Sequence, residues 1–413
     1  MIKSIISPFS ILLLCSLFLC TCDSAPGKDE EKSAGINDVE IPELLPRPAA
    51  LQNAMEWDRT QSGYMQLASD LRLKDAKAIK PRVTLAQIFV NEARVTGEHG
   101  HYYPAALKMV NEALDLNRGK DTNLEFLALS TKAGVQLSQH EFKEALQTAN
   151  RAIEINPHNA QIYGALVDVN VELGRYDEAV AAADKMVKIR PDLRSYSRVS
   201  YLREIHGDVV GAKEAMISAV KAGAPGYESS AWARLTLGEL YQRYGDEEAA
   251  KKQFEIILRE RPNYPFAIAA LGQLELDKGN YPEAEMLVQE AADIIPEVGY
   301  YIQLAEIYKQ TNQKEKTEKI EDEIFVMLQD DVDSGHNMDL EYAALYRDHF
   351  EDYDKAIVYA EREYKKRPEN IDVSRMMASL YLKKGMADTA APYIKAAGTT
   401  DSKHPEYLAM LGK

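Results

Sequence analysis

A small residue that recurs at almost constant spacing is the feature that most constrains how this chain can fold. The marker positions are Ala106, Ala145, Ala179, Ala212, Ala250, Ala284, Thr317, Ala356 and Ala390. The intervals between them are 39, 34, 33, 38, 34, 33, 39 and 34 residues. A period near 34 residues indicates an array of short units, each of which buries its apolar face only by stacking on its neighbours.

Each unit shows the same order of residue types. In residues 231–264, Leu237, Gly238 and Tyr241 precede a turn glycine, and Ala250 and Phe254 follow it before Pro262 ends the unit. Leu and Tyr at these offsets form the apolar stripe of one helix, and the late proline stops the next helix. This pattern resembles the tetratricopeptide repeat. The resemblance implies an all-α tetratricopeptide-repeat α-solenoid, a right-handed superhelix of antiparallel helix pairs.

The resemblance covers nine units between residues 87 and 404. They are 87–120, 126–159, 160–192, 193–226, 231–264, 265–297, 298–331, 337–370 and 371–404. Extra residues fall at 119–125, 223–230 and 329–336, after every third unit. Two interpretations stay open: the insertions are coincidental, or they separate three blocks of three units by bends. Residues 48–86 are expected to form an atypical helical cap, and residues 405–413 a short C-terminal cap.

The N-terminus has the layout of an export signal. Lys3 precedes a mostly apolar run, Ile5–Leu19, which is too short for an ordinary membrane span. The following Leu19-Cys20-Thr21-Cys22 resembles a bacterial lipobox, which implies a signal peptide over residues 1–21 and lipidation of Cys22. Lipidation of Cys20 and an ordinary secretory signal that is cut after Ala25 are the alternatives.

Residues 22–47 are rich in small and charged residues and are expected to form a flexible acidic tether. Within them, residues 28–31 (Lys-Asp-Glu-Glu) resemble the signal that sends Bacteroidota lipoproteins to the outer cell surface. Asp23 conflicts with this, because it resembles an inner-membrane retention signal of enteric bacteria. We expect an outer-membrane lipoprotein of the cell envelope, on its periplasmic or surface-exposed face, similar to the tetratricopeptide lipoproteins of Bacteroidota.

Composition and motifs exclude several classes of function. The net charge of −16 argues against a nucleic-acid partner, which requires a basic face. No cysteine follows Cys22, so the repeats hold no Cys-ligated metal and no thiol nucleophile. Metallopeptidase, phosphate-loop and nucleophile-elbow motifs are also absent. His99 and His101 lack a third ligand nearby in sequence. We therefore expect no enzyme activity, no cofactor and no metal site.

In the family that the chain resembles, the first helix of each unit lines a concave groove that binds a peptide or a partner helix. The inward positions include Arg194 and Ser197 in the fourth unit. The predicted partner-binding residues are Tyr201, Trp232, Leu235, Gln242, Arg243, Phe266 and Gln273. Trp232 and Phe266 could instead pack against the neighbouring unit. The Lys and Asn residues with which some family members clamp a C-terminal carboxylate are absent from the equivalent places.

The sequence thus predicts a lipid-anchored, non-enzymatic scaffold that binds another cell-envelope protein or peptide through its groove. Glycan capture at the cell surface is the alternative, since glycan-binding lipoproteins of Bacteroidota also contain these repeats and the 23 tyrosines could stack on sugars. Against it, those proteins carry large insertions, whereas the repeats here run nearly unbroken. An enzyme would need a site assembled across several units.

Overall fold

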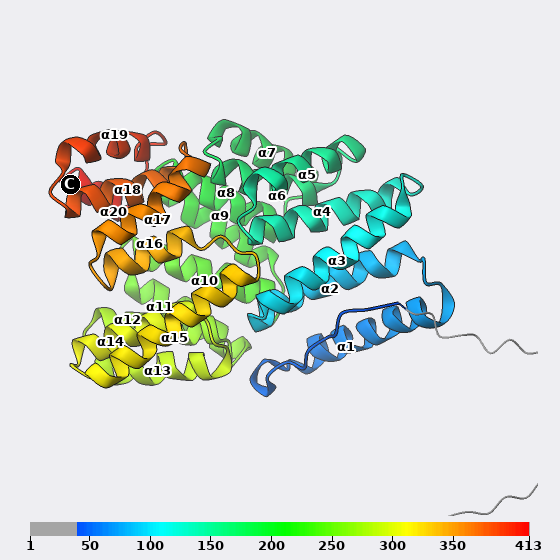
Figure 1. Cartoon of the computed structure of the whole chain (residues 1–413), viewed down its shortest axis with the longest axis horizontal. Helices are drawn as coiled ribbons and strands as arrows, with labels where there is room; N and C mark the ends of the chain where they lie inside the picture. The colour runs from blue at the N-terminus through cyan, green and yellow to red at the C-terminus, as the bar shows by residue number, and fades with distance from the viewer. Residues whose placement is uncertain (1–38, 413) are drawn as a thin grey trace, which may run out of the picture. The chain divides into compact units, whose positions relative to one another are not determined.

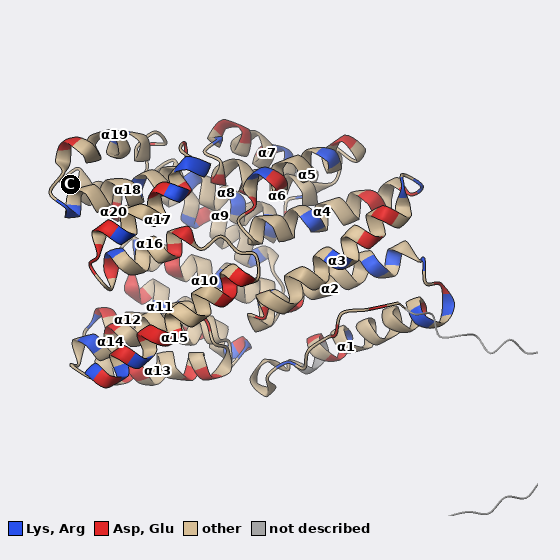
Figure 2. Cartoon of the chain, in the orientation of Figure 1, with Lys and Arg blue, Asp and Glu red and all other residues tan. Residues whose placement is uncertain are grey.

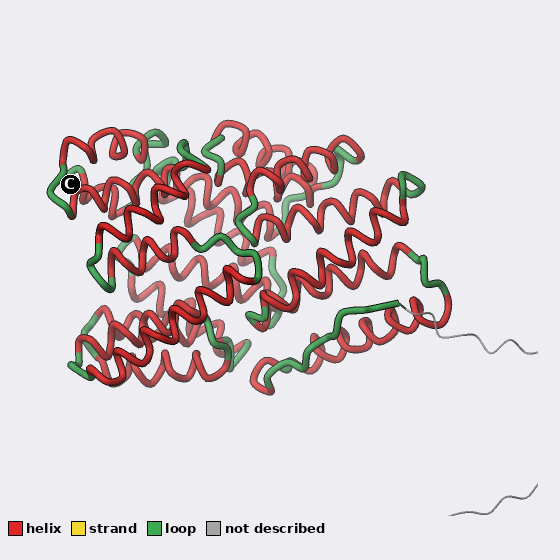
Figure 3. Tube along the Cα trace, viewed as in Figure 1, coloured by secondary structure: helices red, strands yellow, loops and turns green. Residues whose placement is uncertain are grey.

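The computed structural model of the chain describes residues 39–412, and every regular element in that range is helical. A 3-10 turn at Ala49–Leu51 comes before α1 (Ala54–Ser69), which runs into a π-helical turn at Asp70–Lys74. Nine consecutive antiparallel helix pairs follow, and then the short helix α20 (Pro405–Met410) (Figures 1 and 3). The predicted all-α solenoid is confirmed.

Each pair corresponds to one predicted unit, and its two helices pack against each other. The pairs are α2 (Ile79–Thr96) with α3 (His99–Asn117), α4 (Thr122–Ser138) with α5 (Phe142–Ile155), α6 (Ala160–Glu172) with α7 (Tyr176–Ile189), α8 (Leu193–Ile205) with α9 (Val209–Ala222), α10 (Glu228–Arg243) with α11 (Glu247–Glu260), α12 (Pro265–Asp277) with α13 (Tyr281–Ile294), α14 (Val298–Gln310) with α15 (Lys314–Asp333), α16 (Asp339–Asp348) with α17 (Tyr353–Lys366), and α18 (Ile371–Lys383) with α19 (Ala387–Ala397). The first pair begins at Ile79 rather than at residue 87, because its first helix is longer than the repeat pattern requires.

Small residues allow the two helices of a unit to approach closely. A Cβ atom added to Gly238 of α10 would lie 2.3 Å from Cε1 of Phe254 on α11. A Cβ atom on Gly272 of α12 would lie 2.6 Å from Cγ2 of Val288 on α13. The marker residue Ala250 is fully buried in the same layer. The regular spacing of small residues therefore marks the lines along which close-packed helices touch.

The segment before α1 packs along the first helices. Ile41 is buried with the core of α1–α3, and Arg47 is 3% exposed. Two hydrogen bonds of 2.7 Å join the Arg47 guanidinium to the Glu92 carboxylate on α2. Residues 39–47 are not part of a flexible tether, contrary to expectation, because the apolar side chain of Ile41 and the buried charge of Arg47 both have partners there. The signal peptide, Cys22 and the rest of the predicted tether lie outside the described residues.

The three insertions affect the stacking differently. At the first two, α3 packs on α4 and α9 packs on α10 as at the other unit boundaries. At the third, α15 continues to Asp333 and the backbones of α15 and α16 lie further apart. Large side chains fill the wider space, with Phe325 against Tyr342, Tyr346 and Phe350 at centroid distances of 6.4, 5.9 and 5.6 Å. The stacking is continuous through two joints and widened at the third.

Units that are far apart in sequence are also in contact. Helix α3 of the first unit packs against α15 of the seventh. His140 Nδ1, in the second unit, lies 2.8 Å from the carbonyl oxygen of Asn337, which is 197 residues away. In the third unit, the Glu172 carboxylate pairs with Arg367. We call these contacts of units 1–3 with units 7–9 the closure interface, and through it the array turns back on itself.

Candidate functional site

The first helices of five consecutive units surround one hollow of about 610 Å³, which we call the central hollow. Residues of α2, α4, α6, α8 and α10 line it. Arg94 on α2 pairs with Glu228 on α10, with 3.4 Å between Nη2 and Oε2. The inner faces of the first and fifth units therefore meet across this space. Its volume lies within the range of about 300–1,000 Å³ that is typical of ligand sites.

A second hollow of about 260 Å³, the aromatic hollow, adjoins the first. Both are lined by Trp232 together with Asp168, Ser197 and Arg198. Met216 and Leu240, each 2% exposed, are also among the residues that line the aromatic hollow. Trp232 and Tyr201 keep 37% and 38% of their surface exposed. Large aromatic side chains left open beside an apolar surface are typical anchors for a protein partner.

Tyr201 extends the aromatic hollow towards the C-terminal units. A third hollow of about 250 Å³ lies between Tyr201, Glu204 and Arg243 on one side and Asp372, Arg375 and His404 on the other. Burial, followed by the nearby carboxylates of Asp372 and Glu172, raises the pKa of the Tyr201 hydroxyl well above its ordinary value. This hydroxyl therefore stays protonated at physiological pH and can donate a hydrogen bond.

Three arginines reach the central hollow, and two of them are neutralised. Arg198 donates to both carboxylate oxygens of Asp168, at 2.8 and 2.5 Å, and Gly164 makes room for its guanidinium. Arg94 pairs with Glu228, as described above. The Arg194 guanidinium has no hydrogen bond or ion pair within 39–412 and is solvent-exposed. Burial by the surrounding wall lowers the pKa of the Arg194 guanidinium. The nearby Asp192 carboxylate opposes this shift, whereas the charges of Arg94 and Arg198 add to it.

The structure brings some of the predicted groove residues together and separates others. Tyr201, Trp232 and Arg243 all line the aromatic hollow, and the guanidinium of Arg243 pairs with Glu204. Leu235 is 7% exposed and packs in the core of the fifth unit, with Phe254 and Ile257. Its side chain points into the core and not into the groove, because its position on α10 belongs to the stripe that packs on α11.

Of the remaining predicted residues, Gln242 lies on α10, and Phe266 and Gln273 lie on α12 of the next unit. Phe266 is half-buried and packs against Tyr264 and Tyr300, with ring centroids 5.3 and 6.2 Å apart, so it contributes mainly to stacking between units. Gln242 donates to Asp277, and Gln273 donates to Asp277 and accepts from Gln303. These glutamines form a polar network on neighbouring first helices.

Arg94, Asp168 and Arg198 were missed as candidate site residues. Arg198 follows Arg194 by one helical turn, so the two side chains lie on the same face of α8. This spacing was the available signal. Arg194 is the unpaired arginine because Arg94 on α2 pairs with Glu228 on α10 and Arg198 pairs with Asp168 on α6. No local sequence pattern predicts that these helices meet.

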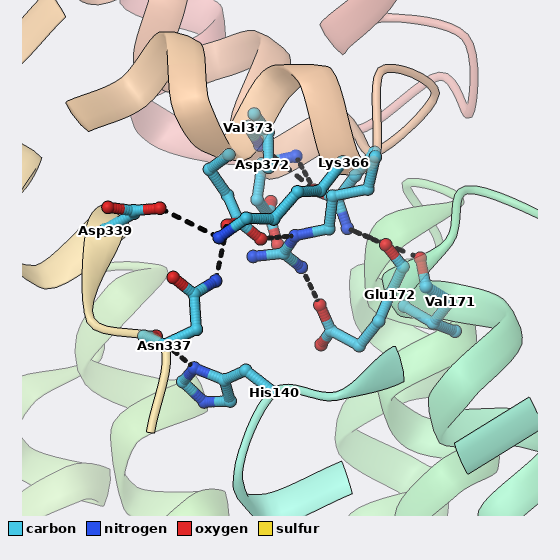
Figure 4. Close-up of polar contacts among 11 residues, drawn as sticks. His140, Val171, Glu172, Asn337, Asp339, Lys366, Asp372 and Val373 are labelled. Atoms are coloured by element: carbon cyan, nitrogen blue, oxygen red, sulfur yellow. Dashed lines mark hydrogen bonds and ion pairs between the residues drawn. The ribbon is translucent and has the colours of Figure 1, made fainter. Parts of the chain in front are cut away.

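Figure 4 shows polar contacts at the closure interface. Arg367, which is 7% exposed, binds Glu172 of the third unit and Glu363 of its own helix. Burial opposes the ionisation of Glu363, but Arg367, Asn337 and Lys366 together hold its pKa below the ordinary value. Lys366 also pairs with Asp339, at 2.8 Å. The Arg367–Glu172 pair thus attaches the eighth unit to the third, while Glu363 of the eighth unit holds Arg367 in place.

A group of titratable residues lies where the first and seventh units meet. Burial and then His336 lower the pKa of His99 to about 4, whereas burial and then Asp331 raise the pKa of Glu297 to about 7. His99 stacks on Tyr103, with ring centroids 5.2 Å apart, and His101 Nε2 lies 2.8 Å from the Glu43 carbonyl oxygen. In the described part of the chain, no three His, Cys, Asp or Glu residues are placed to hold a metal ion.

Two further findings concern charge and membranes. Figure 2 shows basic and acidic residues interspersed along the helices. Among the described helices, none combines the length and the apolar character that crossing a membrane would require.

Comparison with known proteins agrees with this architecture. Residues 136–203 and 235–298 each match a family model described as tetratricopeptide repeat. Tetratricopeptide repeats are present in this chain. The matched segments contain α5–α7 and α11–α13 in full, and thus include both first and second helices of the units.

Two curated proteins are similar in sequence to parts of this chain. Anaphase-promoting complex subunit 7 of Arabidopsis thaliana is 26% identical over 212 residues, which is 51% of this chain and 36% of that protein. Cellulose synthase operon protein C of Pseudomonas fluorescens (strain SBW25) is 24% identical over 189 residues, which is 44% of this chain and 14% of that protein. The chain therefore matches little more than a third, at most, of the length of these relatives.

Among solved structures, a chain of the APC/C hetero-tetramer Cut9-Hcn1 aligns with this chain with a TM-score of 0.48 and 14% identity. The alignment covers 88% of this chain and 61% of that chain. Tetratricopeptide solenoids are typically protein-binding scaffolds without enzyme activity.

Proposed function

We propose that the protein is a lipid-anchored scaffold that binds an extended segment of another cell-envelope protein through the central and aromatic hollows. The observation that carries this proposal is the pair of half-exposed aromatic side chains, Tyr201 and Trp232, beside an apolar floor. Such side chains supply large contact areas when a partner covers them. The lipobox-like sequence around Cys22 supports the envelope location.

Site-specific photocrosslinking in the cells that make the protein tests the partner. A photoreactive phenylalanine analogue replaces Trp232 in the groove, and the control replaces Val210, which is 71% exposed on the second helix α9. We expect one defined adduct with an envelope protein from position 232 and none from position 210. The same adducts from both positions, or no adduct from position 232, would contradict the proposal.

A separate experiment tests the anchor. Cells are fed an alkyne-bearing fatty acid, and the protein is examined for incorporated label. We expect label in the parent chain and in Cys20→Ser but not in Cys22→Ser, together with loss of the Cys22→Ser chain from the membrane fraction. An unlabelled parent chain would contradict lipid anchoring without bearing on the groove.

A further inference from the structure

Arg194 is the one arginine of the central hollow that has no partner within 39–412. Arg94 and Arg198 have carboxylate partners on α10 and α6, and these pairs fix where the two guanidiniums lie. Arg198 also donates to the Arg194 carbonyl oxygen, at 3.1 Å. The backbone that carries Arg194 is thus fixed, while its guanidinium keeps all of its donors available.

The hollow therefore holds an uncompensated positive charge in a chain whose net charge is −16. Its lining contains Arg94, Arg194 and Arg198; Glu228 pairs with Arg94 and Asp168 pairs with Arg198, so one positive charge, that of Arg194, has no ion pair within 39–412. A guanidinium binds a carboxylate through two parallel hydrogen bonds, which are stronger than bonds between neutral groups. A planar anion that enters the hollow would replace the repulsion between Arg194 and its neighbouring arginines with attraction.

We propose that the groove selects a peptide segment that places an Asp or Glu side chain on Arg194 and an apolar side chain in the aromatic hollow beside Trp232. The inference rests on the proposed function, since it names the chemistry of the segment that the same groove binds. The wall continues on both sides of Arg194, from α2, α4 and α6 to Trp232 and Arg243. A bound segment therefore runs past Arg194 in both directions, so the carboxylate belongs to a side chain and not to a chain end.

Phage display tests this chemistry with a defined probe. Random 12-residue peptides are displayed at the N-terminus of a coat protein, so that none has a free C-terminus, and are selected on the immobilised full chain. The enriched peptide is synthesised with a fluorescein label and an amidated C-terminus. Its affinity is then measured by fluorescence anisotropy for the parent chain, Arg194→Gln, Trp232→Ala and Arg259→Gln. Arg259 is the matched control, since it is exposed on the second helix α11 and has no ion pair in the described structure.

We expect the enriched peptides to share one acidic residue at a fixed distance from an apolar residue. Arg194→Gln should weaken binding by about 10- to 100-fold, which corresponds to the loss of hydrogen bonds to a charged group. Replacing the shared acidic residue by its amide should weaken binding equally, and Arg259→Gln should leave the affinity unchanged. An equal affinity of the parent chain and Arg194→Gln would overturn the inference.

The outcomes separate this inference from the proposed function. If peptides fail to bind Trp232→Ala but bind Arg194→Gln as tightly as the parent chain, the groove binds peptides but does not select a carboxylate through Arg194. The enriched peptide is also synthesised with a free C-terminus, and binding by that form but not by the amidated form would overturn the side-chain assignment. Peptides that bind the parent chain and Trp232→Ala equally would count against both proposals.

Discussion

Gly174 offers a sharp test of whether the closure interface forms in solution. It follows α6 with a φ of +74°, and a Cβ atom there would lie 2.4 Å from both the carbonyl carbon and the carbonyl oxygen of Glu369. Gly245 occupies the turn of the fifth unit with a φ of +79°, and its Cβ position has nothing within 4 Å. The two glycines therefore share the same backbone strain, and only Gly174 touches a distant unit.

The difference between Gly174→Ala and Gly245→Ala isolates the contact between units. An alanine in the left-handed region costs about 1–2 kcal/mol at either position. At Gly174, the added Cβ atom must also move about 1 Å further from the Glu369 backbone, because ordinary van der Waals contacts begin near 3.4 Å. The Glu369 backbone is held by Asn370, whose side chain is 2% exposed and donates to the Glu172 carbonyl oxygen at 3.0 Å. Forced overpacking of this kind costs about 1–3 kcal/mol more.

Urea unfolding and a distance measurement together give the readout. Spin labels at Val180→Cys and Val358→Cys, both exposed, report the separation of the third and eighth units. Ser replaces the three native cysteines in all variants. Gly174→Ala should unfold at clearly lower urea than Gly245→Ala, or show a longer distance between the labels. Equal unfolding midpoints and unchanged distances in the two variants would refute the closure interface.

Two further predictions concern charged groups at this interface. Arg367→Ala should destabilise the fold by about 3 kcal/mol, because it leaves the buried Glu363 carboxylate without its main partner. Urea unfolding measures this change, and the control variant Arg259→Ala should have nearly the stability of the parent chain. Glu297, with a pKa of about 7 when folded against 4.5 ordinarily, contributes stability that is fully present below about pH 4.5 and is lost as the pH rises through 7. Glu297→Gln should therefore gain thermal stability relative to the parent chain between pH 5 and pH 8, as measured by calorimetry, and a constant difference would contradict the assigned burial.

The repeats could be predicted from sequence because each unit repeats the same local packing. Ala250 and Gly238 recur at fixed offsets since every unit brings two helices into the same close contact. Leu235 shows the limit of this reasoning. A position counted as inward by analogy with the family lies in the apolar stripe of its own unit, because the rotation of α10 decides which side chains reach the groove.

The closure interface could not be predicted in this way. Arg367 and Glu172 lie 195 residues apart, and neither the repeat period nor the local composition relates them. Their pairing depends on the small rotation that each unit adds to the next, which accumulates over about six units of this length. An error of a few degrees in each unit would separate the two side chains completely.

Closure and the groove are consequences of the same curvature. The rotation that carries Arg367 onto Glu172 also brings α10 to face α2, so that Arg94 reaches Glu228 and the central hollow forms between them. In an open array, the first helices would form a broad concave face, and Arg194 would be surrounded by water, where a single ion pair contributes little. In the closed array, Arg194 remains exposed, but the surrounding wall displaces part of its water and strengthens a carboxylate contact with it. Variants that open the closure interface should therefore weaken ligand binding at residues that they do not touch.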